Sequence, residues 1–222
     1  MTPVDFTPDA VLFDMDGLMI ESERALLQCW REASHGLGLH HLDDALWLSF
    51  VGLSDRACTE LLRERLDEVQ LQALLHDLSQ RYNRHVEAGL PLKPGILELL
   101  AELEQRNIPR AVVTSTRRER AMQKLERCGL LPHFDTVVTG SDVVHAKPAP
   151  DIYLLAAERL RVAPARCVVL EDSVPGVRAA LAAGMTPIQV PDLVIPDEAA
   201  RALGHRIADS LVHARGLIAA AL

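Results

Sequence analysis

The sequence predicts an α/β fold: a doubly wound parallel β-sheet forms the core, and an all-helical domain is inserted after the first strand. Short, continuously apolar runs recur along the chain and are followed by helical stretches, which is typical of parallel strands covered on both faces. The interval between the first two runs, residues 19–91, shows only helical periodicity. It is far longer than an ordinary strand–helix connection, so we interpret it as a separate domain.

The elements of the core follow from the apolar runs and the residues that bound them. The expected strands are residues 10–13, 110–113, 136–138, 167–170 and 187–190, and the expected helices between them are residues 95–105, 119–128 and 151–160. Pro148 and Pro150 precede the last of these helices, where a missing backbone N–H carries no penalty. The final stretch, residues 198–222, is predicted to be an amphipathic helical tail.

The inserted segment carries apolar stripes at helical spacing, which we interpret as core packing. The stripes are Leu26, Leu27, Trp30 and Ala33, then Leu61, Leu62 and Leu66, then Leu71, Leu74, Leu75, Leu78 and Tyr82. The predicted domains are therefore residues 1–18 plus 92–222 for the core and residues 19–91 for the helical insertion. Two hinges are expected, near residues 17–18 and 90–94.

Composition excludes several classes of protein. Of the 222 residues, 49% are hydrophobic, and 31 acidic against 23 basic residues give a net charge of -8, which disfavours binding to nucleic acid. The four cysteines lie far apart, without metal-ligand spacing. The N-terminus does not resemble a signal peptide, and no apolar run reaches bilayer-spanning length. We expect a soluble, cytoplasmic protein that binds neither nucleic acid nor membranes.

Acidic pairs follow two of the predicted strands. Asp14 and Asp16 come after the first strand and Glu171 and Asp172 after the fourth. Parallel strands bring their carboxyl ends to one edge of the sheet, so the four acids should converge there. Each pair alone is also consistent with a turn or a helix cap, and their joint occurrence favours a site. Such a cluster requires protonation or a cation, and hard oxygen ligands suit Mg²⁺.

Anion-binding groups are predicted at the same edge. Thr114 and Ser115 follow the second strand, where hydroxyl and backbone N–H groups bind phosphate or cap the next helix. Lysine is scarce, because only Lys93, Lys124 and Lys147 occur in the whole chain. Lys147 lies in the loop after the third strand, so we expect it to balance the charge of a carboxylate and a phosphoryl group.

Taken together, these motifs resemble the haloacid dehalogenase-like hydrolase superfamily, in its phosphatase and β-phosphoglucomutase-like branch with a helical cap. The resemblance rests on residues 11–23, 113–115, 147–151, 170–173 and 176–185. It implies a Rossmann-like core with a cap inserted after the first strand and Mg²⁺ as cofactor. It also implies a small phosphorylated metabolite as the binding partner, and we expect a monomer.

The resemblance implies a role for each acid. Asp14 would attack phosphorus and form an aspartyl-phosphate that water then hydrolyses. Asp16 would protonate the leaving oxygen and then deprotonate the attacking water. Mg²⁺ would be held by Asp14, by the backbone carbonyl of Asp16 and by Asp172, with Glu171 supporting.

The remaining implied roles concern phosphate and substrate. Thr114, Ser115 and Lys147 would hold the phosphoryl oxygens. Within the inserted domain, Gly52 and Arg56 are the expected substrate-binding residues.

Three functions are weighed. A Mg²⁺-dependent phosphatase acting on sugar phosphates or nucleoside monophosphates fits the motifs best. A phosphosugar mutase of the β-phosphoglucomutase type is the alternative, although Val51 and Asp55 stand where that branch has a lysine and an arginine, and Leu26 replaces a histidine. A non-catalytic binding protein ranks last, because both acidic pairs are present. Phosphonoacetaldehyde hydrolases are excluded, since their cap requires a lysine and residues 19–92 contain none.

Overall fold

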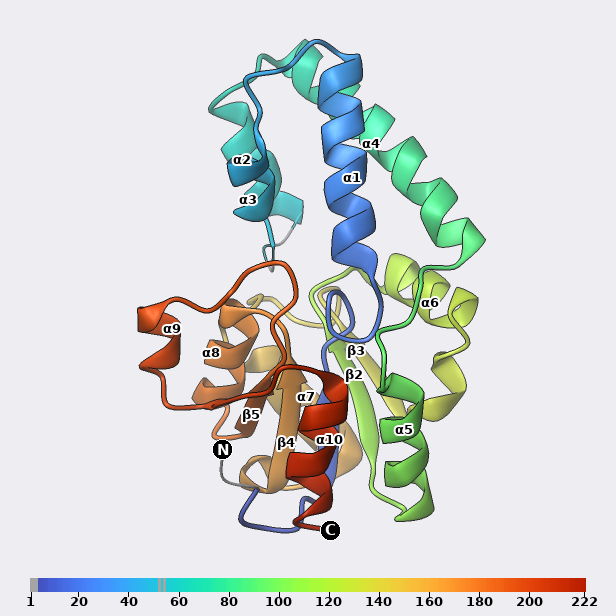
Figure 1. Ribbon diagram of the computed structural model, residues 1–222, viewed down its shortest axis with the longest axis vertical. Helices are drawn as coiled ribbons and strands as arrows, with labels where there is room; N and C mark the ends of the chain where they lie inside the picture. Colours follow the sequence, from blue (N-terminus) through green and yellow to red (C-terminus); the bar gives the residue numbers. More distant parts are fainter. Residues whose placement is uncertain (1–3, 52, 54) are drawn as a thin grey trace.

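The computed structural model describes residues 4–51, 53 and 55–222, and it shows a parallel sheet with helices on both faces and a helical domain stacked on one end (Figure 1). The sheet has six strands in the order β3-β2-β1-β4-β5-β6. These are β1 Ala10–Phe13, β2 Arg110–Thr114, β3 Thr136–Thr139, β4 Cys167–Glu171, β5 Thr186–Gln189 and β6 Arg206–Ile207. The predicted α/β fold with a Rossmann-like parallel core is confirmed.

Strand β1 lies in the middle of the sheet and pairs with β2 on one side and β4 on the other. The chain therefore proceeds outward from β1 in both directions, and a crevice forms beyond the carboxyl ends of the central strands. In the register of β1 and β4, Phe13 is opposite Leu170. The next residues, Asp14 after β1 and Glu171 at the end of β4, consequently lie side by side at this edge of the sheet.

Both faces of the sheet are buried by helices. Leu12 of β1 packs in a cluster with α7 (Asp151–Leu160) and α8 (Val174–Ala182). Its neighbours Val11 and Phe13 point to the opposite face, as successive residues of a strand do. That face is covered by α5 (Ile96–Gln105), α6 (Arg118–Arg127) and α10 (Leu211–Ala219). Burying each such side chain contributes about 1.5–3 kcal/mol, which explains the continuous apolar runs.

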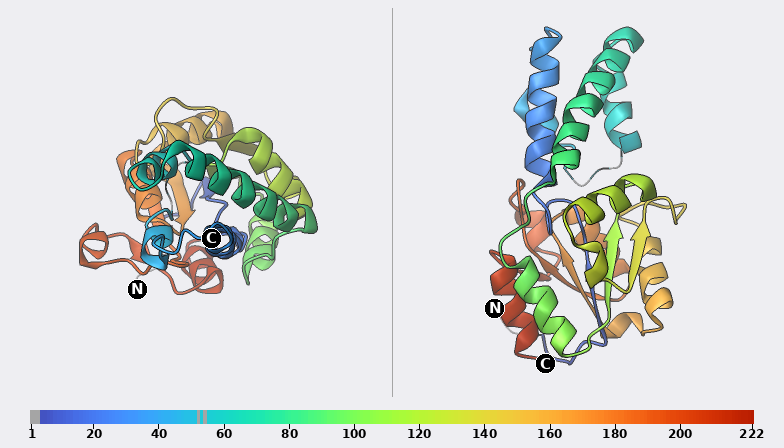
Figure 2. Two further views of the ribbon diagram at one scale, coloured as in Figure 1. Left: turned by 90° about the horizontal axis from the view of Figure 1, so that it is seen from above. Right: turned by 90° about the vertical axis from the view of Figure 1, so that its right-hand side faces the viewer.

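The described part of the inserted domain contains four helices. They are α1 Ser22–Gly36, α2 Asp44–Leu48, α3 Asp55–Arg63 and α4 Glu68–Ala88. Helices α1 and α4 lie side by side above the sheet (Figure 2). Helix α4 begins with a capping box between Asp67 and Gln70 and ends at Gly89, whose φ of 84° favours glycine.

The two connections to the inserted domain run beside each other. Ile20 forms an antiparallel bridge with Leu92, so both connections are hydrogen-bonded together at the base of the domain. Lys93 lies on the second connection, and its ammonium is 2.6 Å from Asp192 and 3.1 Å from Glu21. Arg24 of α1 completes the network at 2.9 Å from Asp192, whose side chain is only 2% exposed. This network ties the inserted domain to the loop that follows β5.

The C-terminal segment differs from the prediction. A continuous helical tail over residues 198–222 is wrong, because the segment forms α9 (Glu198–Arg201), then β6, then α10. Gly204, with a φ of 76°, follows α9, and the chain then adds β6 to the edge of the sheet beside β5. In place of a longer helix, the segment forms backbone hydrogen bonds with the edge of the sheet: the Ala208 N–H donates to the Gln189 carbonyl at 2.7 Å. Two short 3-10 helices, Leu131–His133 and Pro164–Arg166, precede β3 and β4.

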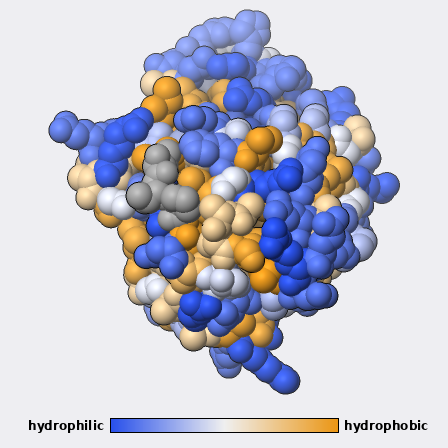
Figure 3. Space-filling view, turned by 60° about the horizontal axis from the view of Figure 1, so that its bottom comes forward, coloured by the Kyte–Doolittle hydropathy of each residue, from blue (hydrophilic) through white to orange (hydrophobic). Residues whose placement is uncertain are grey.

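The surface agrees with the mixed composition. On the end of the core away from the inserted domain, hydrophobic residues are interspersed with hydrophilic ones (Figure 3). Among the described residues, no helix combines the length and the apolar character that crossing a bilayer requires. Helix α4, the longest with 21 residues, carries charged and amide side chains throughout.

The buried ion-pair network predicts a measurable contribution to stability. Lys93→Met removes the most enclosed cation beside Asp192 and should lower the free energy of unfolding by about 3 kcal/mol, since one partner of a buried pair is lost. Arg56→Met is the matched control, because its ion pair with Glu60 is exposed (87% and 58%) and is worth less than about 1 kcal/mol. Urea unfolding measures both variants. An equal loss of stability in the Lys93→Met and Arg56→Met variants would contradict a stabilising role of the network around Asp192.

Candidate active site

Three carboxylates meet at the carboxyl ends of β1 and β4. Asp14 directly follows β1, and its N–H donates to the Leu170 carbonyl at 3.0 Å, which fixes its position beside β4. Glu171 is the last residue of β4, and Asp172 follows it. One carboxylate oxygen from each of these three residues lies within 4.8 Å of the others, and all three side chains are buried. The structure thus brings together Asp14, Glu171 and Asp172.

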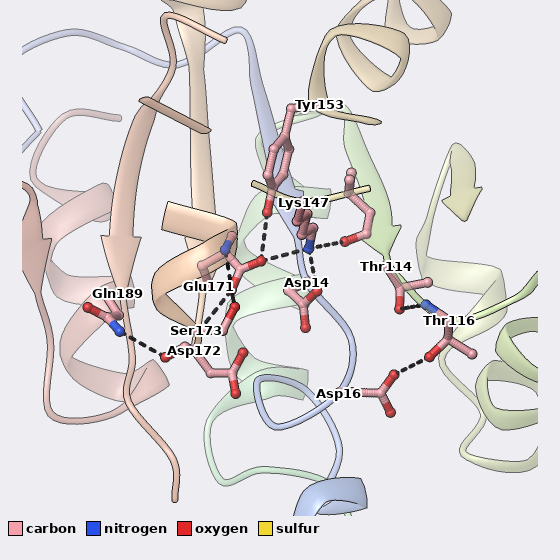
Figure 4. Close-up of polar contacts among 12 residues, drawn as sticks. Asp14, Asp16, Thr114, Thr116, Lys147, Tyr153, Glu171, Asp172, Ser173 and Gln189 are labelled. Carbon is pink, nitrogen blue, oxygen red and sulfur yellow. Dashed lines mark hydrogen bonds and ion pairs between the residues drawn. The ribbon is translucent and has the colours of Figure 1, made fainter. Parts of the chain in front are cut away.

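The ammonium of Lys147 lies between two of these acids (Figure 4). Its Nζ is 2.6 Å from Asp14 Oδ1, 2.7 Å from Glu171 Oε1 and 3.0 Å from the carbonyl oxygen of Val113. The Lys147 side chain is 3% exposed. Burial alone would lower the pKa of Lys147, but the attraction of Asp14 and Glu171 outweighs it and the pKa is raised well above the ordinary value. Lys147 therefore remains charged.

Glu171 is held by further hydrogen bonds from the far side of the cluster. The Tyr153 hydroxyl of α7 donates to Oε1 at 2.9 Å, and the Ser173 hydroxyl and N–H donate to Oε2 at 2.9 and 3.0 Å. Gly176 of α8 passes so close that a Cβ there would overlap the Glu171 carboxylate. The orientation of Glu171 is therefore determined by α7, α8 and the loop before α8.

The electrostatics of the cluster favour a cation. Burial raises the pKa of Asp14 to about 8, with Lys147 opposing the shift and Glu171 reinforcing it. Burial also raises the pKa of Asp172 well above its usual range, and the neighbouring charges of Glu171 and Asp14 add to this effect. One lysine is thus insufficient to offset three buried carboxylates. Hard carboxylate oxygens that are buried and short of positive charge fit a divalent ion such as Mg²⁺.

Asp16 has partners of its own. Its Oδ1 accepts from Lys124 Nζ of α6 at 2.6 Å, and its Oδ2 accepts from the Thr116 hydroxyl at 2.7 Å. Burial alone would raise the pKa of Asp16, but Lys124 outweighs it and lowers the pKa. The carboxylate is thus directed toward α6 and away from the three-carboxylate cluster (Figure 4). Gly17, with a φ of 78°, turns the chain directly afterward.

A cavity of about 70 Å³ opens onto these groups. Its lining includes Asp14, Asp16, Glu23, Thr114, Ser115, Thr116, Lys147, Asp172 and Ser173. Thr114 is almost fully buried, and its hydroxyl accepts from the Thr116 N–H at 3.1 Å. The site residues predicted from the strand ends thus line one small polar cavity. Glu171 is the exception: it does not line the cavity but binds Lys147, which does.

Neither of the two substrate-binding residues predicted in the inserted domain, Gly52 and Arg56, is confirmed by the structure. Gly52 lies outside the described residues. Arg56 belongs to α3, and its guanidinium binds Glu60 of the same helix at 3.1 Å with a side chain that is 87% exposed. It is not among the described residues that line the small cavity or the larger one beside it. The structure therefore does not place Arg56 at the site.

Several contacts within the candidate site could not be predicted from the sequence motifs. Lys124 and Thr116 hold Asp16, and Tyr153 holds Glu171. The sequence did carry a signal for Lys124, namely the scarcity of lysine, and each of the three lysines contacts a carboxylate in the structure. Tyr153 gave no such signal, because its ring packs in the apolar stripe of α7 like any core residue.

The fold and this arrangement define an α/β protein with a buried acidic site and one lysine at the carboxyl edge of its parallel sheet. Residues 11–190 match the family of haloacid dehalogenase-like hydrolases, and the chain belongs to this family. The match extends from β1 to the residue after β5 and contains the whole inserted domain.

Several individual proteins of this family are similar to the chain over most of its length. A phosphorylated carbohydrates phosphatase of Thermotoga maritima is 34% identical over 181 residues, which cover 81% of this chain and 83% of the relative. A fructose-1-phosphate phosphatase of Escherichia coli is 32% identical over 81% of this chain and 95% of its own length. Among solved structures, a hydrolase of the family from Deinococcus radiodurans with bound phosphate and sodium has a TM-score of 0.79 and 34% identity, covering 98% and 97% of the two chains.

The close approach of Gly176 to Glu171 predicts a selective effect of one methyl group. Gly176→Ala should destabilise the protein by about 2 kcal/mol, because a buried and fully bonded carboxylate has no room to move. Gly216→Ala in α10 is the matched control: no atom lies within 4 Å of its added Cβ, and a helical alanine should stabilise by up to about 1 kcal/mol. Thermal unfolding measures both. A stabilised Gly176→Ala variant would refute the packing argument.

Proposed function

We propose that this protein is a Mg²⁺-dependent phosphatase that hydrolyses small phosphomonoesters through an aspartyl-phosphate intermediate. The observation that carries the proposal is the buried Asp14 carboxylate at 2.6 Å from Lys147, beside Asp172 and facing a small polar cavity. Relatives that are phosphatases of phosphorylated carbohydrates support it. The names of these relatives point to sugar phosphates as their own substrates, whereas the sequence motifs alone are compatible with either sugar phosphates or nucleoside monophosphates.

In the first step, an Asp14 oxygen attacks phosphorus, an acyl-phosphate bond forms, and the bond from phosphorus to the alcohol oxygen breaks. Asp16 supplies the proton that the departing alcohol oxygen needs. Because Lys124 keeps Asp16 ionised in the observed arrangement, this hydrogen bond has to be released before Asp16 can carry a proton. In the second step, Asp16 takes a proton from water, which attacks the aspartyl-phosphate and releases inorganic phosphate.

The remaining residues of the cavity position and neutralise the phosphoryl group. Lys147 and the hydroxyl and N–H groups of Thr114 and Ser115 would bind its oxygens, where charge develops in the transition state. Lys147 also neutralises Asp14 partially, which allows two anions to approach each other.

A magnesium ion would be held by Asp14, Asp172 and the backbone carbonyl of Asp16, with Glu171 supporting through its contacts to Lys147 and Ser173. When bound, it supplies positive charge that polarises the phosphoryl group and offsets the buried carboxylates. The raised pKa values of Asp14 and Asp172 and their proximity support this assignment.

The structure favours a phosphatase over a phosphosugar mutase. A mutase must retain a bisphosphate while it turns over, which requires cationic groups on the inserted domain. Among its described residues that line the cavities, none is a lysine or an arginine, and Leu26 and Val51 contribute apolar surface there.

The first functional prediction concerns phosphate release. The wild-type protein should release phosphate from small phosphomonoesters in Mg²⁺, and EDTA should abolish release reversibly. Asp14→Asn should lower kcat by at least about 10³-fold, because the nucleophile is lost. Asp209→Asn is the control and should retain full activity, since its side chain is 94% exposed. Full activity in Asp14→Asn would exclude the mechanism.

The second functional prediction concerns Mg²⁺ binding, which is measured by its effect on stability and not by enzyme activity. At a Mg²⁺ concentration of 100 times its dissociation constant, the wild-type protein should gain about 2.7 kcal/mol of stability. Asp172→Asn should lose most of this gain while remaining folded, because a buried carboxylate with a raised pKa tolerates a neutral replacement. Thermal unfolding with and without Mg²⁺ tests this. An equal gain in both proteins would place the ion elsewhere.

A further inference from the structure

We propose that the substrate's leaving group has a hydrophobic body, aromatic or hydrocarbon, and not the polyhydroxylated body of a sugar. This inference rests on the proposed phosphatase function and concerns the same site. It comes from a second cavity, which lies between the inserted domain and the core.

This cavity has a volume of about 490 Å³ and adjoins the small polar one. Asp16, Glu23 and Thr116 line both cavities, so the two spaces meet at the carboxylate that is proposed to protonate the leaving oxygen. An ester whose phosphoryl group lies at Asp14 would therefore extend its alcohol into the larger cavity. The volume exceeds that of a methyl or ethyl group by far and suits a ring or a branched chain.

The walls contributed by the inserted domain are largely apolar. Leu26 and Leu27 of α1 and Leu75 and Leu78 of α4 line the space, together with an aromatic cluster. In that cluster the rings of Trp30 and Trp47 stack with centroids 4.8 Å apart, and Phe50 meets both edge-on at 5.7 Å. Leu26, Leu27 and Leu75 are only partly buried, so they present apolar surface that the fold itself does not cover.

The polar groups of the lining are few on the helical side and are engaged on the core side. On the helical side, α1 contributes the Glu23 carboxylate at the end next to the polar cavity, and α3 and α4 add the Thr59 and Ser79 hydroxyls, the Cys58 thiol and Tyr82. On the core side, Lys124 binds Asp16 at 2.6 Å and lies 5.1 Å from the centre of the Tyr82 ring. Arg120 binds Asn83 and Gln123. Arg117, exposed at the start of α6, is the remaining cation of the lining.

The energetic consequence favours a hydrophobic leaving group. Each buried methylene of the substrate gains about 0.8 kcal/mol against such walls. Each sugar hydroxyl that faces Leu26 or Leu75 without a partner loses about 1–3 kcal/mol. Because an apolar pocket rejects an added hydroxyl by only about 10²-fold, we expect a preference of roughly 10- to 100-fold and not an absolute exclusion.

The test compares esters with equivalent leaving oxygens. 2-Phenylethyl phosphate and glucose 6-phosphate are both esters of primary alcohols, so their intrinsic reactivity is similar and the difference reports recognition of the body. With the full-length protein in Mg²⁺, kcat/KM should be at least about 10-fold higher for 2-phenylethyl phosphate, mainly through a lower KM.

Substitutions in the wall should change this preference. Leu75→Asn, and independently Leu26→Asn, should raise KM for 2-phenylethyl phosphate several-fold without raising KM for glucose 6-phosphate. Val69→Asn is the matched control on α4: Val69 is 80% exposed and is not among the cavity's lining residues, so the preference should stay unchanged. Circular dichroism of each variant confirms folding, and the two leucine positions provide independent tests.

The outcomes separate the two proposals. Phosphate release from both esters with equal or higher kcat/KM for glucose 6-phosphate overturns the inference and leaves the phosphatase function intact. No release from any small phosphomonoester in Mg²⁺ overturns the phosphatase function, and the inference with it. A preference for 2-phenylethyl phosphate that Leu75→Asn and Leu26→Asn both weaken supports the inference.

Discussion

The site depends on one buried ion-pair arrangement, in which the Lys147 ammonium is shared between Asp14 and Glu171 at the edge of the sheet. Three carboxylates converge there, and desolvation alone would drive them to protonate. Lys147 offsets part of this cost, and the three carboxylates keep an excess of negative charge. The loop between β3 and α7 must therefore bring Lys147 inward, while Tyr153 and Ser173 fix the position of Glu171 from behind. Packing of α7 and α8 against the sheet thus fixes the side chains of the acidic site.

The two cavities are formed by different parts of the molecule. The polar cavity is formed by strand ends, whose positions the sheet pairing fixes rigidly, and this suits groups that must be placed to within fractions of an ångström. The larger cavity is covered by helices that connect to the core through only two adjacent segments. Lys93 and Asp192 join these segments to the loop after β5. Substitutions at Leu26 or Leu75 consequently change the larger cavity without changing the strand ends that carry the acids.

Lysine is scarce in this chain, and all three lysines form ion pairs with acids. Each of the three lysines contacts buried or partly buried acids: Lys93 at the base of the inserted domain, Lys124 at Asp16 and Lys147 at Asp14. Only Lys147 received a role from the sequence, because it alone lies in a strand–helix loop at the acidic edge. Lys124 lies in the middle of α6, and its contact with Asp16 spans 108 residues. Helical periodicity says nothing about a partner that distant.

The sequence by itself determined the features that arise from local patterns: the parallel strands, the acids that follow them and the helical character of residues 19–91. Only the tertiary structure decided the features that depend on distant neighbours. The order of strands placed Asp14 beside Glu171, and pairing with β5 replaced part of the expected helical tail by β6. Packing of α6 directed Asp16 toward Lys124. In the apolar stripes, periodicity shows which residues share a helix face, whereas the space left between the domains decides that Leu26 and Leu75 line a cavity.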